Sequence, residues 1–267
     1  MTFAADTHAH RLDAEHWSTP IRGGWDIRGN ANGGYLLALC ASAMRAHVDR
    51  PDPITVTAHY LAPGKAGPAT LRAQTIRAGR QLATVSATLS ANDRPVLQLL
   101  GSFGDLSARG DFPERIHGGP PTLPEPSQCV RVSSQNVVAP SLFRDRVELL
   151  LHPDDAGFMQ NMPSGEARLR GWFRLEGDEP MSTLALLLAA DAFPPTIFNT
   201  ALPGGWTPTV ELTVHVRARP AAGWLRAQFT HRFASSGFIE EDGEIWDSND
   251  SLVAQSRQLA LLPLVAP

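Results

Sequence analysis

The segment NGGYLLALCASAMRAHV, Asn32–Val48, decides the first half of the fold. After Gly33-Gly34 it becomes a long run dominated by Ala, Leu and Met, which are strong helix formers. Asp49-Arg50-Pro51 then interrupts the run, so the sequence predicts a helix that ends near Val48. A helix that is apolar on nearly all sides is buried in a folded protein, so the segments around it are expected to cover it.

Four segments with alternating apolar and polar residues follow this helix. Turn residues separate them, as at Pro63-Gly64, Ala78-Gly79 and Asn92-Asp93. The pattern predicts four antiparallel strands arranged as a meander, over residues 54–61, 69–77, 83–90 and 96–103.

The second half of the chain repeats this order. LALLLAADAF, Leu184–Phe193, predicts an apolar helix, and strand patterns follow over 209–216, 225–233, 238–246 and 252–261. One constant offset lays Thr55 on Thr209 and superposes two identical four-residue segments, Leu71-Arg72-Ala73-Gln74 and Leu225-Arg226-Ala227-Gln228. An identity in register with a repeated helix and repeated strands indicates an internal duplication.

A long apolar helix wrapped by a curved antiparallel sheet is the hotdog arrangement. We therefore expect an α+β fold with two tandem units, a double hotdog. The N-terminal unit is expected over 1–107, a Pro/Gly-rich linker over 108–140, and a C-terminal unit over 141–267. Leading strands are expected at 147–151 and 167–175 in the second unit and around 17–27 in the first.

Composition narrows the classes of function. The 267 residues carry a formal net charge of −4, which argues against nucleic-acid binding. The longest apolar stretch, Leu184–Ala190, is far shorter than the ~20 residues of a membrane span. Two cysteines cannot build a disulfide framework, and the N-terminal residues lack a signal-peptide pattern, so a cytoplasmic location is expected.

Several short motifs, in order along both halves, resemble the acyl-CoA thioesterase II (TesB-like) family. In the first half these are Gly33-Gly34, Tyr60-Leu61-Ala62-Pro63-Gly64 and Arg77-Ala78-Gly79-Arg80. In the second half they are Ala190-Asp191-Ala192-Phe193-Pro194, Thr209-Val210-Glu211-Leu212-Thr213 and Leu252-Val253-Ala254-Gln255-Ser256-Arg257-Gln258. The resemblance implies hydrolysis of acyl-CoA without a metal or cofactor, with Asp191, Thr209 and Gln258 orienting the hydrolytic water.

The residues themselves give Asp191 some support of their own. A negative charge at the end of an apolar helix is unfavourable, so a carboxylate there calls for a reason. The repeat sets Asp191 against Leu37 and, with a small shift, Gln258 against Gly101. Only the second half therefore carries these side chains, which indicates one active site per chain.

The predicted mechanism is water attack on the thioester with Asp191 as general base. A backbone N–H of Gly33 or Gly34 is expected to stabilise the oxyanion at the start of the first helix. Direct attack by Asp191 to form an acyl anhydride remains an alternative. Chain-length preference is expected to depend on side chains such as Met44, Phe193 and Phe198.

Two other functions fit the same fold. A hotdog hydratase or dehydratase would need an Asp and a His close together before a helix, and neither helix start shows that pair. A non-catalytic acyl-CoA-binding protein is the second alternative. The sequence contains no zinc motif, and the acidic run 240–244 is expected to form a solvated hairpin.

A homodimer or higher homo-oligomer is expected.

Overall fold

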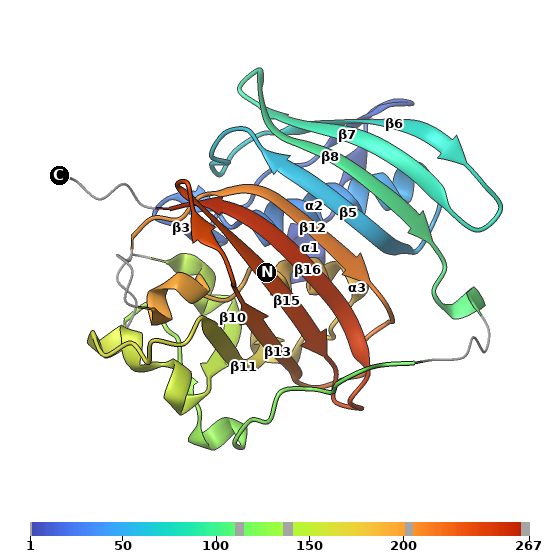
Figure 1. Ribbon diagram of the computed structural model, residues 1–267. Helices are drawn as coiled ribbons and strands as arrows, with labels where there is room; N and C mark the ends of the chain where they lie inside the picture. The colour runs from blue at the N-terminus through green and yellow to red at the C-terminus, as the bar shows by residue number, and fades with distance from the viewer. Residues whose placement is uncertain (1, 110–114, 136–140, 201–204, 263–267) are drawn as a thin grey trace.

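A computed structural model describes residues 2–109, 115–135, 141–200 and 205–262. Two helices, α2 (Gly33–His47) and α3 (Thr183–Ala189), lie against one face of a long antiparallel sheet (Figure 1). A short helix, α1 (Phe3–Asp6), precedes them, and single 3-10 turns occur at η1 (Ser107–Arg109), η2 (Pro126–Gln128), η3 (Leu142–Asp145), η4 (Pro153–Asp155), η5 (Gly157–Gln160), η6 (Glu176–Asp178) and η7 (Thr196–Asn199).

The described strands form one 14-stranded sheet and a separate two-stranded hairpin. The long sheet has the order β1-β2-β6-β7-β8-β5-β12-β16-β15-β13-β11-β10-β9, with β14 paired to β15, and β3 pairs with β4. The strands are β1 (His10–Arg11), β2 (His16–Ser18), β3 (Asp26–Ile27), β4 (Asn30–Ala31), β5 (Asp52–Tyr60), β6 (Thr70–Ala78), β7 (Ala83–Ala91), β8 (Arg94–Gly104), β9 (Val130–Arg131), β10 (Val147–Leu151), β11 (Arg168–Leu175), β12 (Thr209–Val216), β13 (Leu225–Thr230), β14 (Ala234–Ser235), β15 (Phe238–Trp246) and β16 (Leu252–Leu261).

The predicted meander is wrong in one respect. In the first half β5 pairs with β8 instead of β6, and in the second half β12 pairs likewise with β16. Each unit thereby brings its first long strand to the junction, where β5 and β12 pair antiparallel with Val56 opposite Val214. Pairing these two strands joins the units into one continuous sheet and leaves neither strand as an exposed edge.

The two units also share their irregularities. A β-bulge interrupts β5 between Pro53 and Thr55, and another interrupts β12 between Thr209 and Glu211. Aligning these bulges sets Thr209 opposite Pro53 and not opposite Thr55, as the sequence offset had placed it. Bulges are built features of a sheet, so their recurrence supports the duplication independently of residue identity.

Aligning the two helices at their N-caps corrects the residue of the first unit that is equivalent to Asp191. Asn32 caps α2 and Ser182 caps α3, each by accepting a backbone N–H three residues on. Asp191 then falls opposite Ala41 and not Leu37. The asymmetry survives this change, because neither position in the first helix carries an acid.

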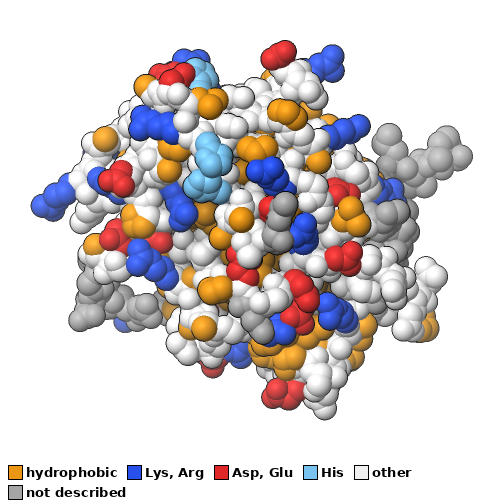
Figure 2. Space-filling view, turned by 180° about the vertical axis from the view of Figure 1, so that it is seen from behind, with side chains coloured by type: hydrophobic (Ala, Val, Ile, Leu, Met, Phe, Trp, Pro, Cys, Tyr) orange, Lys and Arg blue, Asp and Glu red, His pale blue; other side chains and the backbone are white. Residues whose placement is uncertain are grey.

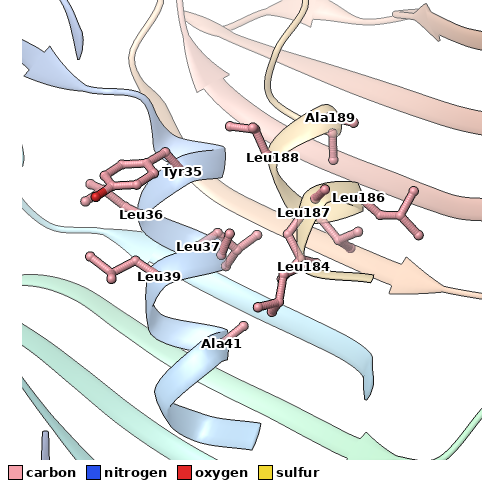
Figure 3. Packing of buried hydrophobic residues seen from close by; sticks show 14 of the residues in the cluster. Tyr35, Leu36, Leu37, Leu39, Ala41, Leu184, Leu186, Leu187, Leu188 and Ala189 are labelled. Carbon is pink, nitrogen blue, oxygen red and sulfur yellow. The ribbon is translucent and has the colours of Figure 1, made fainter. Parts of the chain in front are cut away.

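The core of the molecule lies between α2 and α3, which run antiparallel (Figure 3). Leu37 and Leu184 are buried at this contact, with Leu187 and Leu188 beside them. The helices approach closely at Gly34, where an added Cβ would meet the carbonyl oxygens of Leu188 at 2.8 Å and Leu187 at 2.9 Å. A glycine is required there because only backbone fits.

The predicted linker, 108–140, lies partly outside the described residues, at 110–114 and 136–140. The part of it that the structure describes packs against the second unit. There β9 pairs with β10, and Trp172 donates from Nε1 to the Pro124 carbonyl at 2.9 Å. The leading segment predicted near 17–27 is divided between β2 and the β3–β4 hairpin. This hairpin lies beside the start of α2, because Asn32 N–H donates to the Trp25 carbonyl at 2.8 Å.

Truncation at the helix contact should destabilise the fold. Leu37 is fully buried, so Leu37→Ala is expected to lower the free energy of unfolding by about 2–5 kcal/mol. Leu100→Ala is the matched control, because that side chain is 53% exposed and should cost about 0.5 kcal/mol or less. Urea unfolding followed by circular dichroism measures both, and equal losses would contradict the assigned core.

Candidate active site

Asp191 lies in the turn after α3. The helix ends at Ala189 and not at Phe193 as predicted, and Asp191 N–H donates to the Leu188 carbonyl at 3.1 Å. The carboxylate is directed toward the start of α2 in the other unit. Its Oδ2 accepts hydrogen bonds from Asn32 Nδ2 and from Gly34 N–H, each at 2.9 Å.

This placement resolves the electrostatic mismatch seen in the sequence. The carboxylate follows the C-terminal end of α3, where negative charge is unfavourable, but α2 runs antiparallel and presents its N-terminal end to the same carboxylate. Burial raises the pKa of Asp191 to about 6, while the hydrogen bonds from α2 and Asn32 and the nearby Arg144 guanidinium act in the opposite direction.

Asn32 is a site residue that the sequence reading treated only as a helix start. Its Oδ1 accepts from Tyr35 N–H at 2.9 Å and caps α2. Its Nδ2 donates both to the Asp191 carboxylate and to the Asp191 carbonyl, each at 2.9 Å. One amide therefore begins the helix and fixes the acid, and its position directly before Gly33-Gly34 was the available signal.

Gly33 and Gly34 both lie against the Asp191 carboxylate. The Gly34 N–H is occupied by Asp191, and the Gly33 N–H faces the same carboxylate. An added Cβ at Gly33 would meet Asp191 Oδ2 and a Tyr60 ring carbon, each at 2.9 Å. These glycines thus let the acid approach the backbone closely, so the start of α2 binds the Asp191 carboxylate.

Thr209 and Gln258 come together from neighbouring strands of the second unit. Gln258 donates from Nε2 to Thr209 Oγ1, a side-chain hydrogen bond between β16 and β12. Thr209 pairs with Ala260, two residues from Gln258 on the same face of β16. Both side chains line the cavity that Asp191 also lines, so all three predicted residues face one space of about 860 Å³.

The cavity lies between the two units. The first unit contributes Asn32, Gly33 and Tyr60, and aromatic side chains of the second unit form much of the opposite wall: Phe158, Phe193, Phe198 and Phe229. Phe193 and Phe198 thus line the cavity as expected. Met44 does not border it and is buried in the core instead.

Two further polar residues of the cavity were missed. Tyr60 donates from Oη to the Gly33 carbonyl at 2.9 Å, and burial raises its pKa well above the usual range. Arg144 is buried and donates from Nη1 to the Ala192 carbonyl at 2.7 Å. Burial lowers the pKa of Arg144 to about 10, so it remains a cation at neutral pH near Asp191. Tyr60 opens the motif Tyr60-Leu61-Ala62-Pro63-Gly64, which gave it no role of its own, and Arg144 lies in none of the quoted motifs.

The acidic run 240–244 is not simply a solvated hairpin. Glu241 lines the cavity and accepts hydrogen bonds from Thr196 N–H at 2.8 Å and Thr196 Oγ1 at 2.6 Å. Burial raises its pKa to about 7. Strand alternation explains this: Ile239, Glu241 and Gly243 share the inner face of β15, whereas Glu244 is exposed.

The equivalent place in the first unit is closed. Gly101 stands where Gln258 does, and the Phe103 ring comes within 2.9 Å of the position of a Cβ there. Phe103 and Ala41 are fully buried, so apolar packing occupies the region that holds polar side chains in the second unit. This agrees with one site per chain.

Comparisons with known proteins now decide the family. Residues 21–104 match the acyl-CoA thioesterase N-terminal domain, and residues 120–262 match the acyl-CoA thioesterase C-terminal domain. A crystal structure from Thermobifida fusca that carries the name thioesterase II is 30% identical, with a TM-score of 0.88 over 99% of this chain and 98% of that one. The chain belongs to the acyl-CoA thioesterase family. It is therefore a thioester hydrolase, and the family resemblance read from the sequence is confirmed.

Two further relatives extend the comparison. A hotdog-fold protein of unknown function from Alicyclobacillus acidocaldarius is 20% identical, with a TM-score of 0.87 over 99% of this chain and 98% of that one. It confirms the double hotdog fold. An uncharacterised Mycobacterium tuberculosis protein is 28% identical over 260 residues, covering 90% of this chain and 88% of the relative.

The described residues also bear on surface charge, metal binding and membrane crossing. Figure 2 shows Lys and Arg side chains interspersed with Asp and Glu on the rear face of the molecule. Among the described residues no group of three His, Cys, Asp or Glu side chains is placed to hold a metal ion. Within the same residues, no helix has the length and apolar character needed to cross a membrane.

Variants of Asn32 should separate helix capping from positioning of the acid. Asn32→Ser keeps a capping oxygen but loses the donor to Asp191, whereas Asn32→Ala loses both. We expect both to lose thioester hydrolysis by about tenfold or more, and only Asn32→Ala to lose about 1 kcal/mol of stability as well. Steady-state kinetics and thermal unfolding measure the two effects, and full activity in Asn32→Ser would contradict the assignment.

Proposed function

We propose that this protein hydrolyses acyl-CoA to a free carboxylic acid and CoA, with Asp191 as the general base. The observation that carries the proposal is the half-buried Asp191 carboxylate at the junction of the two units, which faces the same cavity as Thr209 and Gln258. The family supplies the reaction class, and these side chains supply an arrangement that can activate a water molecule.

In this proposal the water molecule lies between Asp191 and Gln258. Because Gln258 donates from its amide nitrogen to Thr209, its carbonyl oxygen is left to accept a proton of the water. The second proton of the water is directed to the Asp191 carboxylate. A pKa of about 6 suits that task, since the acid is ionised near neutral pH and is still basic enough to take a proton.

The start of α2 serves the reaction at two stages. Before attack, the helix N–H groups hold the negative charge on Asp191. As the proton moves to Asp191, negative charge develops on the thioester oxygen instead. The positive end of the α2 dipole, with Gly33 nearest the cavity, then stabilises that oxyanion, and the CoA thiolate leaves without metal or covalent assistance.

The cavity has room and character for such a substrate. Phe158, Phe193, Phe198 and Phe229 offer an apolar wall for the acyl chain. At the rim, the exposed Arg28 lies in the turn between β3 and β4 and offers a positive charge to the CoA phosphates. This distribution supports a binding mode in which the acyl chain lies in the second unit and CoA lies on the side of the first.

Substitution of Asp191 and of Gln258 tests this mechanism. Asp191→Asn should lower kcat/KM for thioester hydrolysis by about 10²–10⁴-fold, because it removes the base at nearly constant volume. Gln258→Ala should lower it by about tenfold or more, because the water loses an acceptor. Thiol release from a panel of acyl-CoAs is the measurement, with circular dichroism as the check on folding.

Gln255→Ala is the matched control for Gln258→Ala. Gln255 lies on the same strand but on the outer face, where it accepts hydrogen bonds from Arg217, and its loss should leave hydrolysis nearly unchanged. Near-normal turnover in Asp191→Asn would overturn the proposed base. Acyl-CoA binding without thiol release by the unmodified protein would instead indicate the non-catalytic alternative.

A further inference from the structure

Glu241 is a carboxyl group in a wall of the cavity that is otherwise largely apolar. Its neighbours on the inner face of β15 are Ile239 and Gly243, and Phe229 pairs with Gly243 on the adjoining strand β13. None of the steps proposed for water activation uses this carboxyl. A carboxyl at an apolar surface is costly unless it has hydrogen-bond partners, so its place here requires an explanation.

Among the described residues, one of its two oxygens has hydrogen-bond partners and the other has none. Oε2 accepts from both the N–H and the hydroxyl of Thr196, at 2.8 and 2.6 Å. Within the described part of the chain, no hydrogen-bond donor reaches Oε1. Because Glu241 borders the cavity, this oxygen is available to a ligand that brings its own donor.

A buried histidine fixes the direction of these hydrogen bonds. His231 lies with its Nδ1 at 2.8 Å from Thr196 Oγ1. Above its pKa of about 7, Glu241 is ionised and accepts the single hydroxyl proton of Thr196, so His231 then donates Nδ1–H to the Thr196 oxygen. Burial lowers the pKa of His231, which keeps the imidazole neutral. The network thus presents Glu241 to the cavity as an acceptor.

The position of Glu241 places this acceptor near the reacting end of the substrate. Glu241 on β15 is the direct cross-strand partner of Gln258 on β16. Neighbouring antiparallel strands are separated by about 5 Å, and paired side chains lie on the same face. An acyl group whose thioester carbonyl is beside Gln258 therefore brings its first few carbons to Glu241.

We propose that Glu241, held by Thr196 and His231, selects acyl groups that carry a hydroxyl on one of the first carbons after the thioester carbonyl. The inference rests on the proposed acyl-CoA hydrolysis and adds a substrate class to it. The hydroxyl donates to Oε1 and completes the hydrogen bonding of the carboxyl. An unsubstituted chain leaves Oε1 without a partner, and for that reason binds less well.

The test compares three acyl-CoAs of equal chain length: unsubstituted, hydroxylated near the carbonyl, and the O-methyl ether of the hydroxylated form. The unmodified protein should favour the hydroxyacyl-CoA over the unsubstituted one by about tenfold or more in kcat/KM, and the ether should lose this advantage because it cannot donate. Glu241→Leu should bring the hydroxyl preference to about one, with Glu241→Gln between the two.

Ratios within one variant cancel any loss of folded enzyme, and Glu244→Gln serves as the control because Glu244 is exposed on the same strand. The same preference in the unmodified protein and in Glu241→Leu would overturn the inference. Failure of the proposed function is separately visible, as absence of thiol release from every acyl-CoA. The preference is then read from calorimetric Kd values of non-hydrolysable CoA thioethers with and without the hydroxyl.

Discussion

The structure depends on one interaction, the hydrogen bonding of the Asp191 carboxylate by Asn32 and Gly34 across the junction of two duplicated units. The carboxylate and the N-terminal end of α2 stabilise each other. The carboxylate fills donors at the start of α2 that would otherwise lack partners in the protein interior, and α2 supplies the partial positive charge that a buried carboxylate needs. The close approach of α2 and α3 at Gly34 brings them within reach.

The same interaction explains why a duplicated chain is required. Asp191, Thr209 and Gln258 belong to the second unit, but the groups that hold the acid belong to the first. A single unit would present either the acid without its donors or the donors without the acid. Pairing of β5 with β12 sets this relation, since it aligns the two units in one sheet. The first unit could then fill its own equivalent place with Phe103 and keep only the positioning role.

Sequence predicted those features that rest on local patterns. The apolar runs identified both helices, and alternation placed the long strands within a few residues. The order of the strands in the sheet was predicted wrongly, because the pairing of β5 with β8 depends on tertiary packing and leaves no local sequence pattern. Helix α3 was expected to extend to Phe193, but it ends at Ala189, where the chain turns to direct Asp191 at α2. For the site, motifs identified the second-unit residues, and the place of Asn32 before Gly33-Gly34 was a signal that sequence offered, whereas Arg144 and Glu241 are recognised only from the folded cavity.

The central claim is that the first unit tunes the acid of the second, and the pH dependence of hydrolysis tests it most directly. The measurement is kcat/KM from about pH 5 to about pH 8 for the unmodified protein and Asn32→Ser, both in a Glu241→Gln background that removes the second titrating carboxyl. Activity should rise with pH through an apparent pKa near the value of about 6 given for Asp191, because the ionised form is the base. Loss of the Asn32 donor should move that pKa upward, since the bond stabilises the ionised form. Superimposable profiles in the two proteins, or a flat profile in the first, would contradict the account.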